Sequence, residues 1–115
     1  MRTLNIILTA VVLSIAAPIR AHEACGHEPT VPSLRLCVEH EAKHGAIDNE
    51  GLARALLAQL DAAEAAVQRG QPEVAIEVLN AFVATVRAQA GIHIDPQHAA
   101  HMILHAEQVI AALAS

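Results

Sequence analysis

The chain has 115 residues, a formal net charge of −5 with neutral histidines, and 54% hydrophobic residues. This length fits one domain, and an acidic chain lacks the basic patches that nucleic acids and anionic lipid surfaces require. Phe82 is the single aromatic residue apart from histidine, so Ala, Leu, Val and Ile must build the core, which favours close-packed helices over a β-sandwich.

Residues 1–21 are typical of a secretory signal peptide. Arg2 supplies the positive start, the apolar run from Leu4 to Ala17 is too short to span a bilayer, and Ala21 offers a cleavage site. Cleavage after Ala17 and an uncleaved membrane anchor are the alternatives. Cleavage after Ala21 leaves five Lys and Arg against twelve Asp and Glu, a net charge near −7. We therefore expect a periplasmic or secreted protein that is not integral to the membrane after cleavage.

Two cysteines lie in the exported part of the chain, at Cys25 and Cys37. An even number of cysteines in an oxidising compartment favours one disulfide, which would close the segment 25–37. A Cys₂His₂ zinc site with His27 and His40 is the alternative, although the cysteine spacing is too long for a zinc knuckle.

The first two expected helices follow an irregular arm over residues 22–33, which contains Gly26, Pro29 and Pro32. A short helix is predicted from Leu34 to His44, with Ser33 as its N-cap and Gly45 as its stop. Asp48 or Asn49 can cap the next helix, from about residue 50 to residue 69. Its apolar residues recur at spacings of three and four, namely Leu52, Leu56, Leu60, Ala63 and Val67.

A third helix is expected to begin at Pro72, where proline suits the first turn, and to end at Gly91. Asp95 followed by Pro96 starts the last helix. Short loops make neighbouring helices antiparallel, so residues 34–115 are predicted to form an all-α domain. The expected architecture is a small up-and-down bundle of three long helices and one short N-terminal helix. Its predicted centre contains Phe82, Leu56, Leu60, Leu79, Met102, Ile103 and Ile110.

Several segments resemble one helical domain family. They are IDNEG at residues 47–51, LLAQLDAA at residues 56–63, and AIEVLNAFVATVRAQAGIHI at residues 75–94. These segments, and more weakly the chain to about Leu113, resemble the FIMAH domain, which occurs in many exported multidomain bacterial proteins. Gln59 departs from the family by standing where Lys is usual. The resemblance implies a helical, exported accessory module rather than an enzyme. Residues in the family's register are Asn49, Gly51, Gly70, Phe82 and Gly91.

His40, Glu41 and His44 form an H-E-x-x-H motif. On a helix the two histidines share a face and can bind zinc, with Glu41 as the base for a bound water. A protease of this kind needs a third ligand and a substrate-binding strand, and no strand pattern precedes the motif. The alternative is a solvated helix end, with His44 near the negative end of the helix dipole.

The last helix carries a second histidine cluster. His98, His101 and His105 fall within about 60° of one another on the helix, beside the apolar face. Imidazoles suit zinc, copper and nickel, although a polar flank that happens to use histidine is the alternative. In the arm, the amine and ring of His22 could bind copper together with His27.

The eight histidines divide into a front group, His22, His27, His40 and His44, and a rear group, His93, His98, His101 and His105. If the first and last helices pack together, the two groups could meet in a shared metal site or a pH-sensitive surface. The leading prediction remains a non-catalytic module that needs no cofactor and binds a protein or cell-envelope partner. A His-rich periplasmic protein that binds Zn, Cu or Ni is second, with a zinc hydrolase third. The candidate metal ligands are His40, His44, His98, His101 and His105.

Overall fold

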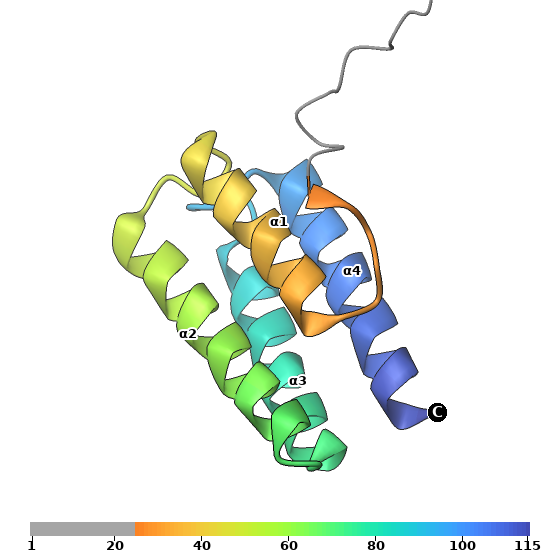
Figure 1. Cartoon of the computed structure of the whole chain (residues 1–115). Helices are drawn as coiled ribbons and strands as arrows, with labels where there is room; N and C mark the ends of the chain where they lie inside the picture. The colour runs from red at the N-terminus through yellow and green to blue at the C-terminus, as the bar shows by residue number, and fades with distance from the viewer. Residues whose placement is uncertain (1–24) are drawn as a thin grey trace, which may run out of the picture.

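Four helices make up the part of the chain that the computed structural model describes, residues 25–115 (Figure 1). The predicted signal peptide, residues 1–21, and the start of the predicted arm, His22 included, lie outside the described residues. The structure confirms the predicted all-α fold. The helices are α1 (Val31–Lys43), α2 (Glu50–Gln68), α3 (Pro72–Gln89) and α4 (Pro96–Ala114).

The helices pack in a closed ring in which each contacts two others. Helix α1 packs on α2, α2 on α3, α3 on α4, and α4 back on α1. Short turns connect consecutive helices, so neighbours run antiparallel as predicted (Figure 1). The ring brings the first and last helices side by side. Among the described helices, none is long and apolar enough to cross a membrane.

Helix α1 begins earlier than the sequence pattern predicted. It starts at Val31, and the Thr30 hydroxyl accepts a hydrogen bond from the Ser33 amide at 3.2 Å. Ser33 is therefore a buried residue inside the helix, and the prediction that it caps the helix is wrong. Pro32 favoured an irregular segment in the sequence. Proline is nevertheless well tolerated in the first turn of a helix, because the amide groups there have no helical acceptor.

The other helix starts follow the predicted caps. The Asn49 side chain accepts from the Leu52 amide at 2.8 Å, and Asp95 accepts from the amides of Gln97 and His98, each at 3.1 Å. Pro72 occupies the first turn of α3. These side chains satisfy amide groups that a helix leaves without partners, which is why the starts of α2 and α4 could be located from sequence.

The core lies inside the ring and is almost entirely aliphatic. Phe82, Leu56, Leu60 and Leu79 are fully buried and Met102 is 2% exposed, as predicted. The remaining two predicted core residues, Ile103 and Ile110, are only partly buried and pack against the edge. They lie beside the face of α4 that points into the core, which consists of Ala99, Met102, Ala106 and Val109 at helical spacing.

The loop between α1 and α2 pairs with the loop between α3 and α4. Ile47 and Ile94 form an isolated antiparallel bridge, and both are buried. The Asp48 amide donates to the carbonyl of His93, and the Asp95 amide donates to the carbonyl of Ala46, each at 2.9 Å. This pairing fixes the end of α1 beside the beginning of α4, which positions the site described next.

Candidate functional site

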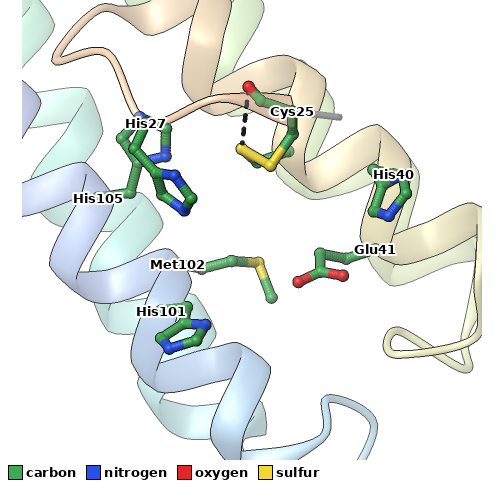
Figure 2. Close-up of a pocket in the computed structure, with 8 residues that line it drawn as sticks. Cys25, His27, His40, Glu41, His101, Met102 and His105 are labelled. Atoms are coloured by element: carbon green, nitrogen blue, oxygen red, sulfur yellow. Dashed lines mark hydrogen bonds between the residues drawn. A yellow bond between two sulfur atoms is a disulfide. The ribbon is translucent and has the colours of Figure 1, made fainter. Parts of the chain in front are cut away.

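The candidate site lies on the face where α1 and α4 meet, called here the α1–α4 face. The described part of the arm, residues 25–30, runs along this face before α1 begins (Figure 1). His27 from the arm, His40 from α1, and His101 and His105 from α4 line one cavity (Figure 2). Two members of the front histidine group and two of the rear group therefore line one cavity, but among the described residues no three His, Cys, Asp or Glu side chains are placed to hold a metal ion.

A disulfide holds the arm to α1. Cys25 and Cys37 are bonded, with their Cα atoms 4.7 Å apart, which confirms the predicted pairing. Because the sulfurs are bonded to each other, the alternative Cys₂His₂ zinc site is not formed. Both cysteines line the cavity, so the disulfide makes part of its wall (Figure 2).

His105 holds the other side of the arm. Its side chain is buried, with the residue 4% exposed, and its Nε2 lies 2.7 Å from the carbonyl oxygen of Glu28, to which it donates. The His27 ring lies 5.9 Å from the His105 ring. The histidine stripe was expected beside the apolar face, and for His105 this is wrong. The arm covers α4 at this point, and helical periodicity carries no information about the path of the arm.

His98 contacts two carboxylates and is not among the residues that line the cavity. Its Nδ1 lies 2.7 Å from Asp95 Oδ2, and its Nε2 lies 3.7 Å from Glu41 Oε1. The hydrogen bond with the His98 side chain is the main reason that the pKa of Asp95 is lowered. Of the three histidines predicted to act together on α4, only His101 and His105 line the cavity, whereas His98 links the start of α4 to α1.

The cavity is small, about 30 Å³, which is room for a single water molecule or metal ion. Glu41, whose side chain is 16% exposed, extends into this space opposite the side chain of Met102 (Figure 2). Within residues 25–115, no group of three or more His, Cys, Asp or Glu side chains is arranged so that it could hold a metal ion. The lining residues are Cys25, His27, Cys37, His40, Glu41, His101, Met102 and His105.

The H-E-x-x-H motif lies at the end of α1. The rings of His40 and His44 share a face, as predicted, with centroids 4.2 Å apart. However, His44 is exposed at the C-cap and is not among the cavity-lining residues, whereas Glu41 is. The described residues bring no third ligand to this histidine pair. The geometry that a zinc hydrolase needs is therefore not assembled around the motif in the described part of the chain.

Two exposed leucines flank the cavity, and sequence reasoning did not select either. Leu36 of α1 is 56% exposed and Leu104 of α4 is 54% exposed. Each lines a more open hollow that shares residues with the cavity, His40 on the α1 side and His101 on the α4 side. Met102 was predicted only as a core residue. The available signal was a methionine directly beside His101 in a chain otherwise packed with Ala, Leu and Val.

Comparison with known families gives one match: the FIMAH domain model matches residues 31–111, from the start of α1 to near the end of α4. The match begins earlier than the segment whose resemblance was recognised in the sequence, because α1 is included. No curated protein and no solved structure matches the chain.

Proposed function

Because the chain belongs to the FIMAH domain family, we propose that it is an exported helical accessory domain that binds a protein partner and has no catalytic activity. Membership of the family is the observation that carries this proposal. The Cys25–Cys37 disulfide supports a location outside the cytoplasm, in the periplasm or beyond it, because such bonds persist in oxidising compartments.

The α1–α4 face is the proposed contact surface. Leu36 and Leu104 expose apolar side chains in hollows that the arm also lines, and the buried centre of an interface is more apolar than the surface around it. The arm is held by a covalent bond to α1 and by the hydrogen bond from His105 to Glu28. A surface fixed in this way loses little conformational entropy when it binds, which favours affinity.

Site-specific photo-crosslinking in producing cells tests this proposal. A photo-reactive residue at position 36 or 104 is expected to give the same discrete adduct with one envelope or secreted protein. The matched control is position 77, because Glu77 is exposed on α3, away from this face. Leu36→Glu and Leu104→Glu should abolish the adduct while circular dichroism shows unchanged helicity. Equal crosslinking from position 77, or none from 36 and 104, would contradict the proposal.

Binding of a transition metal is the second candidate function, favoured by the convergence of histidines from the arm, α1 and α4 on one cavity. Imidazole nitrogen suits zinc, copper and nickel. Elemental analysis and titration calorimetry on tag-free protein with an intact disulfide are expected to show one tight equivalent. His40→Ala combined with His101→Ala should remove it, whereas His93→Ala, which changes an exposed histidine at the paired loops, should not. The absence of bound metal and of binding heat would exclude this function.

A further inference from the structure

We propose that the cavity on the α1–α4 face selects a soft metal ion, Cu(I), which it binds through the thioether of Met102 and the imidazoles of His40 and His101. The inference rests on the second candidate function, metal binding, and specifies the ion and the ligand atoms. It begins from the position of Met102, which is 2% exposed and yet lines the cavity between the histidines (Figure 2).

The number of ligands that the cavity offers favours a soft ion. Within residues 25–115, His, Cys, Asp and Glu side chains alone provide no group of three that could hold an ion. A hard or borderline ion such as Zn²⁺ normally requires three or four such ligands. The sulfur of Met102 is an additional donor in the same cavity, and a neutral thioether is a soft ligand of the kind that Cu(I) prefers.

The histidines that line the cavity differ in their hydrogen bonding. Nε2 of His105 is already committed to the carbonyl of Glu28, so His105 acts as a wall of the cavity. Across the described residues, by contrast, the ring nitrogens of His40 and His101 make no hydrogen bond to another protein group. His101 is exposed and His40, whose ring contacts that of His44, is partly exposed, so neither ring is packed into the core.

The charge and the size of the cavity also favour one small cation. The Glu41 carboxylate extends into the cavity, where its negative charge favours a cation even without direct coordination (Figure 2). The disulfide closes one wall, and the volume of about 30 Å³ admits one ion but little more. A small, partly closed site with sulfur and imidazole donors matches the chemistry of Cu(I) better than that of a hydrated divalent ion.

Competition experiments under anaerobic conditions test this inference on the disulfide-intact chain. Cu(I) held by a colorimetric chelator is expected to transfer to the protein in one equivalent. Met102→Leu conserves volume and should keep the fold. It should weaken Cu(I) binding by at least about tenfold, because the loss of even an outer-shell partner of a metal ligand commonly costs that much affinity. His93→Ala is the control expected to bind as the parent protein does.

A direct measurement covers the case in which Met102→Leu fails to fold. Met102 is the only methionine in residues 22–115, so selenomethionine labelling of the mature chain places selenium at this position alone. X-ray absorption at the selenium edge should then show a copper neighbour at bonding distance. Zn²⁺ binding without a selenium–copper contact would overturn the Cu(I) inference and leave metal binding intact. Failure to bind either Cu(I) or Zn²⁺ would overturn both.

Discussion

Two interfaces in the ring of helices are stabilised in different ways, the one between α2 and α3 and the one between α1 and α4. Helices α2 and α3 contribute fully buried side chains, among them Leu60, Leu79 and Phe82, and buried alanines such as Ala63 and Ala75. One side-chain hydrogen bond, from Gln59 to Thr85, joins the two helices. Helices α1 and α4 enclose a small cavity instead, and the arm is held across them by a disulfide and a buried histidine. Because α1 and α4 also contribute fully buried core residues, such as Leu34 and Val109, the histidine-lined cavity is a local interruption of a core shared by all four helices.

The largest loss of stability is expected from the core residues of α2 and α3. Phe82→Ala should destabilise the domain by about 3–5 kcal/mol, because the side chain is fully buried and its removal leaves a void. Urea unfolding followed by circular dichroism measures the loss. Since small domains are stable by only about 5–15 kcal/mol, partial unfolding in the absence of urea is an expected consequence. A variant whose free energy of unfolding falls by less than about 1 kcal/mol would mean that Phe82 is not at the centre of the core.

The next largest loss of stability is expected from removal of the disulfide, which separates its contribution at the α1–α4 face from that of side-chain packing. Replacing Cys25 and Cys37 together with serine should cost about 2–4 kcal/mol, because the disulfide restricts the unfolded chain across a sequence separation of 12 residues. Comparison of urea midpoints with the parent protein checks this value. The far-ultraviolet spectrum should remain helical. An unchanged midpoint would show that the arm unfolds independently of the ring of helices.

A smaller effect is expected from the histidine that holds the arm. His105→Ala should cost about 1–3 kcal/mol, because it removes a buried side chain and leaves the Glu28 carbonyl without its donor. The matched control is His101→Ala on the same helix, which is exposed and should change stability by no more than about 0.5 kcal/mol. Thermal unfolding of both variants measures the difference. Equal losses would contradict the structural role assigned to His105.

The caps of α1 and α2 allow the effects of equal destabilisation near the cavity and away from it to be compared. Thr30→Ala removes the cap of α1 and Asn49→Ala removes the cap of α2, each at a cost of about 1 kcal/mol. Because Thr30 ends the arm, its replacement should also weaken Cu(I) binding, whereas Asn49→Ala should leave binding unchanged. Urea unfolding and Cu(I) competition on both variants test this. Equal effects on binding would show that metal affinity depends only on overall stability.

The smallest expected effect concerns pH at the start of α4. The pKa of Asp95 is lowered in the folded protein, mainly by its hydrogen bond with His98. A carboxyl group with a lowered folded pKa stabilises the protein above its ordinary pKa, and this contribution disappears as the pH falls below about 4. The melting temperature of Asp95→Asn should therefore fall less between pH 6 and pH 3 than that of the parent. An identical fall would argue against this contribution.

The sequence was sufficient where local chemistry decides the structure. The caps Asn49 and Asp95, the proline at position 72 and the period of the apolar residues located three helices, and the cysteine count predicted the disulfide. It was insufficient where distant segments meet. The burial of His105 depends on the path of the arm, and the position of His98 between Asp95 and Glu41 depends on the paired loops. No periodic pattern encodes either arrangement.

The disulfide also determines how the domain carries mechanical tension. A pulling force that enters at Cys25 passes through the covalent bond to Cys37 and directly into the middle of α1. Residues 26–36 are bypassed, so the hydrogen bond between His105 and Glu28 bears none of the load. Under tension the arm therefore stays in place for as long as α1 keeps its contacts with α2 and α4, and the shape of the α1–α4 face is preserved in a stretched chain.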